Sequence, residues 1–149
     1  TEKNWILSAL CPLGLALLVG FAIPNRVMEA KQPQFLVEMN REALESSRYI
    51  LADNVGLAAG LAWELKRSDI ILFNQSGELK YGLSYPDAAG KLLKEEDFSQ
   101  WLAAHRQNGR VSLVVLLGKN EEVSELNLPT PQRIYVQGRI ALLEYAPQP

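Results

Sequence analysis

Asp53 and Asn54 are the polar side chains whose position best suits chemistry. They directly follow the short apolar segment Arg48–Ala52, which predicts a β-strand. In open α/β sheets, ligands bind in the crevice beyond the carboxyl ends of the strands, where this pair is expected to lie. Asp and Asn also accept hydrogen bonds from the first backbone N–H groups of a helix, and this capping role is the favoured one. Asp53 and Asn54 are therefore candidate ligand contacts at the start of a helix.

The segment Gly56-Leu-Ala-Ala-Gly60 lies where a phosphate-binding loop would be sought, between a strand and a helix. Such a loop needs its glycines before the helix, so that backbone N–H groups face the anion. This G-x-x-x-G spacing lacks both the GxGxxG pattern and a Lys-Ser/Thr ending. Its small residues favour close packing of the helix against the sheet instead. The segment therefore predicts no nucleotide or other cofactor.

The remaining candidates for chemistry have structural explanations. His105 is the only histidine, and no cysteine or carboxylate stands at metal-ligand spacing from it. It also lacks an obvious Ser or Cys partner for nucleophilic catalysis, which favours a half-buried boundary histidine. Glu95-Glu96-Asp97 suits the positive N-terminal end of a helix, and the thiol of Cys11 would be inert in its apolar surroundings. We therefore expect no catalytic residue, no cofactor and no metal ligand in this chain.

Apolar periodicity indicates that helices and strands alternate along most of the chain. Alternation of this kind predicts an α/β fold, a mixed β-sheet flanked by helices on both faces in three α/β/α layers. The expected elements are a helix over 35–44, a strand over 48–52, a helix through 58–65, a strand over 69–73, a third strand around 79–83, a helix over 95–105, a strand over 111–117, a short helix over 120–128 and a hairpin over 134–145 that bends at Gly138.

A nearly uninterrupted apolar run, Trp5–Ile23, stands near the start of the chain. Its 19 residues, at about 1.5 Å each, form a helix of roughly 28 Å, close to the ~30 Å hydrocarbon core of a bilayer. A buried helix of a domain this size would show a polar stripe, whereas this run contains only Ser8. We therefore expect a transmembrane helix in residues 1–26 and a soluble α/β domain in residues 27–149.

Two other interpretations of the apolar run stay open. Lys3 before the run and Gly20-Phe21-Ala22 near its end resemble a signal peptide with a small-x-small cleavage site. A buried helix of an ordinary soluble domain is the remaining alternative. The basic residues on the two sides of the run do not fix its orientation, because long domains cross membranes largely regardless of charge.

The charge balance excludes one class of partner. The net charge is −2 and the pI is about 5.5, so the composition suggests no nucleic-acid partner. Lys66-Arg67 is the only adjacent basic pair, which gives no polybasic patch for anionic lipids. The single Cys11 excludes an intrachain disulfide.

Three stretches of the sequence are long and distinctive: CPLGLALLVGFAIPNRVMEAKQPQFLVEM, SRYILADNVGLAAGLAWELKRSDI and GELKYGLSYPDAAGK. Together they closely resemble the C-terminal end of the bacterial lipid A aminoarabinose transferases, the undecaprenyl-phosphate 4-amino-4-deoxy-L-arabinose arabinosyltransferases of Gram-negative inner membranes. The resemblance covers essentially the whole chain. It implies that Trp5–Ile23 is the last span of a many-span glycosyltransferase of the GT-C type, and that the residues from Asn25 onwards form a periplasmic domain.

The resemblance also implies a reaction and its partners. The family moves a cationic sugar from undecaprenyl phosphate to lipid A phosphates, which weakens the attraction of cationic peptides and gives polymyxin resistance. The implied partners are the N-terminal membrane part of the same enzyme, the bilayer, the lipid-linked donor and the lipid A acceptor. The family's acidic catalytic residues lie in that N-terminal part. No position here matches them, so none is carried over.

Three hypotheses follow. The first is a terminal span with a non-catalytic periplasmic domain of a membrane glycosyltransferase. The second is a membrane-anchored periplasmic module in which Asp53 and Asn54 hold a small ligand or a partner. The third, less favoured, is a nucleotide-binding α/β domain.

Overall fold

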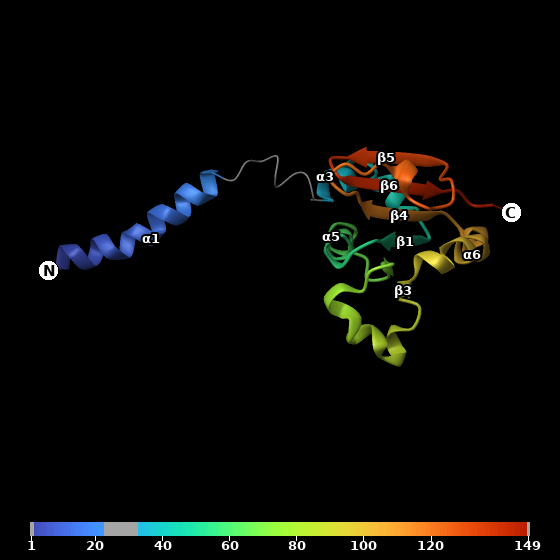
Figure 1. Ribbon diagram of the computed structural model, residues 1–149, viewed down its shortest axis with the longest axis horizontal. Coiled ribbons are helices and arrows are strands. Elements are labelled where there is room, and N and C mark those ends of the chain that lie inside the picture. Colours follow the sequence, from blue (N-terminus) through green and yellow to red (C-terminus); the bar gives the residue numbers. More distant parts are fainter. Residues whose placement is uncertain (1, 23–32, 149) are drawn as a thin grey trace.

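The computed structural model describes residues 2–22 and 33–148. The polar stretch Asn25–Gln34, whose Pro33 and neighbouring Pro24 predict a connector between the apolar run and the α/β domain, lies mostly outside the described residues. The first helix, α1 (Glu2–Ala22), lies apart from the rest of the chain in Figure 1. The elements of the α/β domain are α3 (Gln34–Met39), α4 (Arg41–Glu45), β1 (Tyr49–Ala52), α5 (Val55–Leu65), β2 (Ile71–Phe73), β3 (Leu92–Leu93), α6 (Glu95–His105), β4 (Val111–Leu116), β5 (Arg133–Gln137) and β6 (Ile140–Tyr145). Short 3₁₀ turns lie between them: η1 (Gly77–Lys80), η2 (Gly82–Ser84), η3 (Pro86–Ala88), η4 (Arg106–Asn108) and η5 (Val123–Glu125).

The strands form one mixed sheet of six strands in the order β3-β2-β1-β4-β6-β5. The four strands β3, β2, β1 and β4 run parallel, whereas β6 is antiparallel to both β4 and β5. The apolar sequences of β4 and β6 suit their central places, because each is buried between two neighbouring strands. The hairpin expected over 134–145 is confirmed, and its turn contains Gly138 at φ 62°.

Helices cover both faces of this sheet, as expected. Along β1, Leu51 packs on one face with Phe98 of α6, while Ile50 packs on the other with Leu61 of α5. The side chains of a strand alternate between faces, so a single strand supplies both cores. α6 therefore covers one face and α3, α4 and α5 cover the other, which confirms the α/β/α layers for the part of the chain the structure describes (Figure 1).

Two expected elements are wrong. The third strand is not at 79–83, where the chain forms the turns η1 and η2, but at Leu92–Leu93. None of the side chains in η1, η2 or η3 is buried, so this stretch has no face that could join the core as a strand. The helix expected over 120–128 is reduced to the three residues of η5. The second stretch still packs on the core through Val123, Leu126 and Leu128, but it does so as a single turn and extended chain rather than as a helix.

The helix expected over 35–44 is interrupted at Asn40, which is buried and has φ −122°. The Asn40 side-chain amide donates to the carbonyl oxygen of Leu36 at 2.9 Å, and this local bond competes with continuation of the helix. The break rotates the two short helices relative to one another. As a result Leu36 and Leu44 are buried, whereas Phe35 and Met39 stay exposed.

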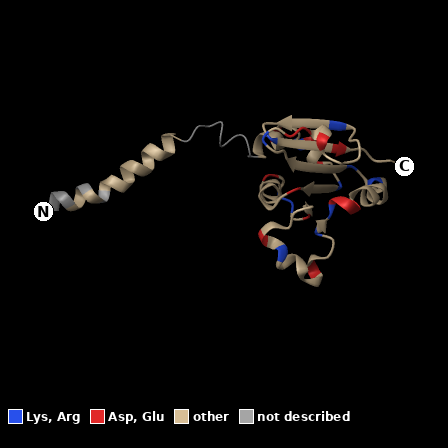
Figure 2. Ribbon diagram, in the orientation of Figure 1, with Lys and Arg blue, Asp and Glu red and all other residues tan. Residues whose placement is uncertain are grey.

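α1 differs from the other helices in that none of its described side chains is buried. Its described side chains are all exposed, including Trp5 (82%) and Phe21 (89%), and Pro12 lies inside it. Figure 2 shows charged residues of both signs interspersed over the α/β domain, whereas the second half of α1 carries none. Among the residues described, no helix reaches the length and apolarity that a membrane crossing requires.

Candidate functional site

The chain reverses its course across the sheet between β1 and β4. From β1 it proceeds outward to β2 and β3, and it then returns to the opposite side of β1 as β4. In open α/β sheets the crevice at such a switch point, outside the carboxyl ends of the strands, is the usual place for a ligand. Asp53 directly follows β1 at this position.

Asp53 and Asn54 both form hydrogen bonds within the domain. Asp53 accepts from the backbone N–H of Leu116 at 2.6 Å and from the Asn54 side-chain amide at 2.8 Å. Asn54 accepts from the backbone N–H of Leu57 at 2.9 Å, which confirms it as the N-cap of α5. Asp53 does not cap the helix. It joins the end of β1 to β4, because its carboxylate satisfies a backbone donor of that strand.

The surroundings of the Asp53 carboxyl group shift its pKa in opposite directions. Burial raises the pKa of Asp53 and is the largest influence, while the hydrogen bonds from Leu116 and Asn54 lower it and the charge of Glu121 raises it. The net effect is a raised pKa. Because the folded state then holds this proton more tightly than the unfolded state, ionisation of Asp53 lowers stability as the pH rises through the folded pKa.

A cavity of about 220 Å³ opens beside Asp53. Each of the four parallel strands contributes a polar side chain to its lining from the segment that follows the strand: Asp53 after β1, Asn74 after β2, Glu95 after β3 and Glu121 after β4. The carboxyl ends of parallel strands meet at one edge of a sheet, which explains the convergence. Glu121 is also fixed locally, since it accepts from the backbone N–H of Gly118 at 2.7 Å.

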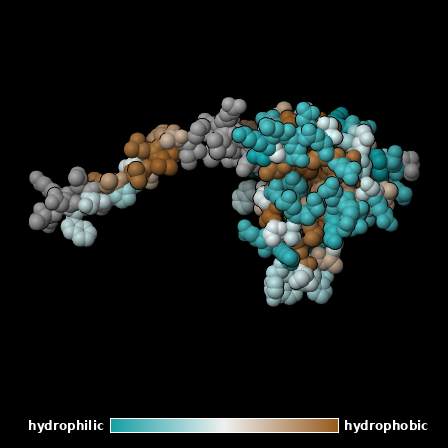
Figure 3. Space-filling model, viewed as in Figure 1, coloured by the Kyte–Doolittle hydropathy of each residue, from teal (hydrophilic) through white to brown (hydrophobic). Residues whose placement is uncertain are grey.

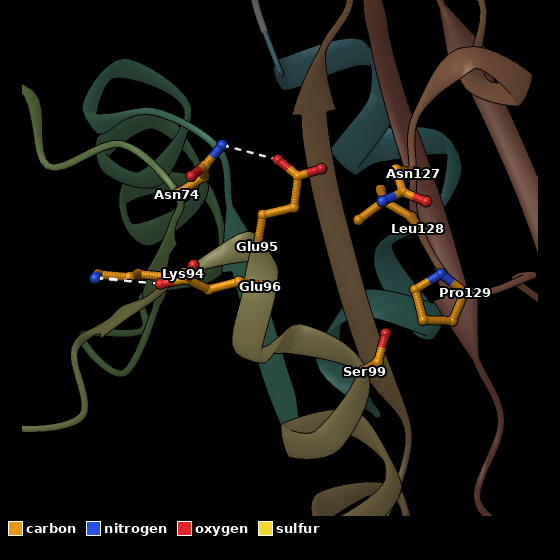
Figure 4. A pocket seen from close by; sticks show the side chains of 8 residues that line it. All are labelled: Asn74, Lys94, Glu95, Glu96, Ser99, Asn127, Leu128 and Pro129. Atoms are coloured by element: carbon orange, nitrogen blue, oxygen red, sulfur yellow. Dashed lines mark hydrogen bonds and ion pairs between the residues drawn. The ribbon is translucent and has the colours of Figure 1, made fainter.

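A second, more open cavity of about 610 Å³ shares Asn74, Glu95 and Leu128 with the first. Figure 4 shows Asn74 and Glu95 pointing toward one another, and their side chains are joined by a hydrogen bond of 3.1 Å. Asn127, Leu128 and Pro129 lie across the opening from them (Figure 4). Among the described residues that line the smaller cavity there is no Lys or Arg, so its three carboxylates favour a cationic amino group or a ligand rich in hydroxyl groups.

Sequence reasoning did not identify Asn74 or Glu121 as site residues, and it assigned Glu95 only to a solvated helix turn. The signal that could have found Asn74 is its place immediately after a strand, the same signal that selected Asp53. Glu121 carried no comparable signal, because its distance from Asp53 depends on the course of the loop after β4.

The other sequence candidates have structural roles. A Cβ atom at Gly60 would lie 2.6 Å from Cγ of Pro33, so the glycine permits close packing, although the partner is the start of α3 rather than the sheet. His105 is half-buried as expected. Its ring stacks on that of Trp101, with 4.2 Å between the ring centres, and lies edge-on to the ring of Tyr49. In the described part of the chain, no three His, Cys, Asp or Glu residues are grouped closely enough to hold a metal ion.

Comparison with known families agrees with this fold. A family model described as "Arabinosyl transferase ArnT, C-terminal domain" matches residues 28–144. The chain belongs to this family. The match confirms the resemblance recognised in the sequence and covers every strand of the arabinosyl transferase domain except the last residue of β6.

Curated relatives of this chain are much longer than the chain itself. Proteins named undecaprenyl phosphate-alpha-4-amino-4-deoxy-L-arabinose arabinosyl transferase are 53% identical over all 149 residues in Edwardsiella ictaluri and 52% identical over 147 residues in Erwinia tasmaniensis. A protein with the same name followed by the number 2, from Sodalis glossinidius, is 56% identical over 142 residues, which is 95% of this chain. The chain spans only 27% of the length of the first two and 26% of the third. No solved structure matches the chain significantly.

Replacing Asp53 by alanine is expected to lower the free energy of unfolding by about 1–2 kcal/mol. The N–H of Leu116 and the amide of Asn54 would each lose a charged acceptor, a loss that exceeds the gain from removing a partly buried charge. Urea unfolding of the full chain in a mild detergent measures the difference. The control is Asp87→Ala, since Asp87 is exposed and its loss should change stability by no more than about 0.5 kcal/mol. Equal stability of the two variants would contradict the bridging role of Asp53.

Proposed function

We propose that this chain is the C-terminal, non-catalytic part of an integral-membrane glycosyltransferase. The whole enzyme would transfer 4-amino-4-deoxy-L-arabinose from undecaprenyl phosphate to lipid A. The observation that carries the proposal is the identity of 53% over the whole chain with a relative bearing the corresponding name. The transferred sugar carries an amino group, so it offsets the negative charge of lipid A phosphates. The consequence is resistance to polymyxin and other cationic antimicrobial peptides, which are drawn to that negative charge.

The catalytic centre belongs, in this proposal, to the part of the enzyme that this chain does not include. Roughly three quarters of the length of each relative lies outside the match. Within the domain, the polar side chains at the switch point already bond to the backbone or to one another. The N-terminal membrane part, the lipid-linked donor and the lipid A acceptor are therefore the expected partners of this domain.

We infer that Trp5–Ile23 is a membrane-spanning helix and that the α/β domain of residues 27–149 lies in the periplasm of a Gram-negative cell, held at the inner membrane. The apolar composition of the run supports this placement, as does the exposure of its described side chains around the whole helix. The name of the relatives adds support, because undecaprenyl phosphate is a lipid and its reaction takes place at a membrane.

Removal of residues 25–149 from the complete enzyme tests the proposal. We expect the truncated enzyme to lose most or all transfer to lipid A, measured by mass spectrometry of lipid A from cells that depend on this enzyme. Immunoblotting of membrane fractions establishes that both forms are present in equal amounts. Undiminished transfer by a stably inserted truncated enzyme would contradict a required role for the domain.

The cavity beside Asp53 favours a second candidate, a membrane-anchored periplasmic module that binds a ligand or a partner. Its carboxylates, Asp53, Glu95 and Glu121, would pair with a cationic amino group such as that of an amino sugar. Titration of the full chain with 4-amino-4-deoxy-L-arabinose, followed by NMR, distinguishes this role. Shifts confined to the cavity would support it, and an unchanged spectrum would contradict it for this ligand.

A further inference from the structure

Large apolar side chains remain uncovered on one side of the α/β domain. They lie on α3, on α5 and on the turns η1 to η3, which follow one another down the side of the domain nearest α1 in Figure 1. α3 and η1 each pack on α5, so α5 connects the elements that carry these side chains. We call this surface the aromatic face. It consists of Phe35 (40% exposed), Met39 (63%), Trp63 (72%), Leu79 (46%), Tyr81 (77%) and Tyr85 (52%).

Local contacts hold the aromatic side chains of this face outward. The ammonium group of Lys66 lies 4.0 Å from the centre of the Trp63 ring, a cation–π contact on the outer surface of α5. The rings of Tyr81 and Tyr85 meet edge to face at 5.7 Å and support one another without touching the core. Exposed apolar surface of this extent marks a site of interaction with a partner or a membrane.

The surface between α5 and the turns is hollowed as well as apolar. A groove of about 230 Å³ opens there, with Ala58, Ala59 and Ala62 of α5 on one wall and Leu79 and Leu83 on the other. Ala59 and Trp63 lie four residues apart and therefore on the same row of the helix. Trp63 therefore projects from the same side of α5 as Ala59. In the space-filling view, pale atoms of intermediate hydropathy and brown apolar atoms reach the surface at the lower part of the domain (Figure 3).

The aromatic face is also where the chain from the apolar run joins the domain. Pro33 rests on Gly60 of α5, where a Cβ atom would approach its ring to 2.6 Å. Trp63 lies one turn further along the same helix, and Phe35 follows Pro33 by two residues. Ten residues, 23–32, connect Ala22 to Pro33, and a chain of that length reaches at most about 36 Å. A membrane that held the apolar run would therefore lie within reach of this face.

We propose that the aromatic face lies against the lipid–water interface of the bilayer, an inference that rests on the proposed membrane anchoring. Trp and Tyr favour this interface because their rings are apolar and their N–H or O–H groups remain hydrated. Lys66, Lys80 and Lys91 lie on or beside the same elements, but Glu38, Glu64, Glu78 and Asp87 lie there too, so the contact rests on the aromatic rings rather than on net positive charge. This contact holds the domain flat on the membrane surface.

Fluorescence of single labels on the full chain tests the orientation. The native thiol is first removed by Cys11→Ser. The dye NBD is then attached to one introduced cysteine at a time, in the variants Met39→Cys, Tyr81→Cys, Lys119→Cys and Leu17→Cys. Each labelled chain is reconstituted in nanodiscs of phosphatidylethanolamine and phosphatidylglycerol. All four native side chains are exposed, so the substitutions leave the core intact. We expect nitroxide-labelled lipid to quench the dye at 39 and 81, and iodide to quench it there several-fold less than at 119.

The label at Leu17 separates the two proposals. If iodide quenches the dye at 39 and 81 as strongly as at 119, while lipid quenches it at 17, the aromatic face points to water and only this inference fails. If iodide also quenches the dye at 17, the anchoring fails and the inference fails with it. If neither quencher reaches 39 and 81, another protein surface covers the face, and the lipid contact is excluded.

Discussion

Replacement of Phe98 by alanine is expected to lower the free energy of unfolding by about 3–5 kcal/mol. Phe98 is fully buried on α6, and its ring meets those of Phe73 at 5.2 Å and Tyr145 at 5.6 Å, both edge to face. The variant would leave a cavity between α6 and the sheet, and the rings around it are held by other contacts that limit collapse. A loss of this size is a large share of the stability of a domain this small.

Urea unfolding of the full chain in detergent, followed by circular dichroism, measures this loss. The control is Tyr81→Ala, which removes an aromatic ring that is 77% exposed and should change stability by no more than about 0.5 kcal/mol. A similar small effect for Phe98→Ala would mean that α6 does not depend on this ring for its attachment to the sheet.

Replacement of Gly109 by alanine is expected to cost about 2–4 kcal/mol. Gly109 has φ 146° and ψ −177°, a conformation that residues with a Cβ atom rarely adopt. An added Cβ would also lie 2.7 Å from Cβ of Arg48, which is bonded to the backbone and cannot move aside freely. This close approach lets the carbonyl of Arg110 accept from the backbone N–H of Arg48 at 2.8 Å, at the start of β1 and β4.

Gly82→Ala is the matched control for Gly109→Ala, because a Cβ at Gly82 meets nothing within 4 Å. Gly82→Ala should leave stability unchanged or raise it by up to about 1 kcal/mol, since alanine restricts the unfolded chain more than glycine does. The measurement is again the urea midpoint of the full chain. Equal midpoints for the two alanine variants would show that the backbone near Gly109 relaxes without strain.

The candidate site could be predicted from the sequence only in part. Asp53 was found because it follows a strand and precedes a helix, and the structure places it at the switch point of the sheet. Its actual bond, to the N–H of Leu116, lies 63 residues away in sequence and has no local signal. The same limit applies to Glu121, which reaches the cavity through a loop rather than a regular element.

The sequence by itself determined the elements whose pattern is local. The apolar run, the helix from Glu95, the buried strand from Val111 and the closing hairpin all follow from the spacing of apolar residues, as does the α/β class. The N-cap at Asn54 is local as well, because the donor is only three residues away.

Only the tertiary structure decided which short apolar stretches became strands and how the strands were ordered. Leu92–Leu93 pairs with β2, whereas the stretch around Leu79 does not, because a segment joins the sheet only where a neighbouring strand offers free backbone groups. The seating of Pro33 on Gly60, the cavity at the carboxyl ends of the strands and the aromatic face all join residues far apart in sequence. Such contacts depend on the distances between residues that are remote in sequence, and only the folded chain sets these distances.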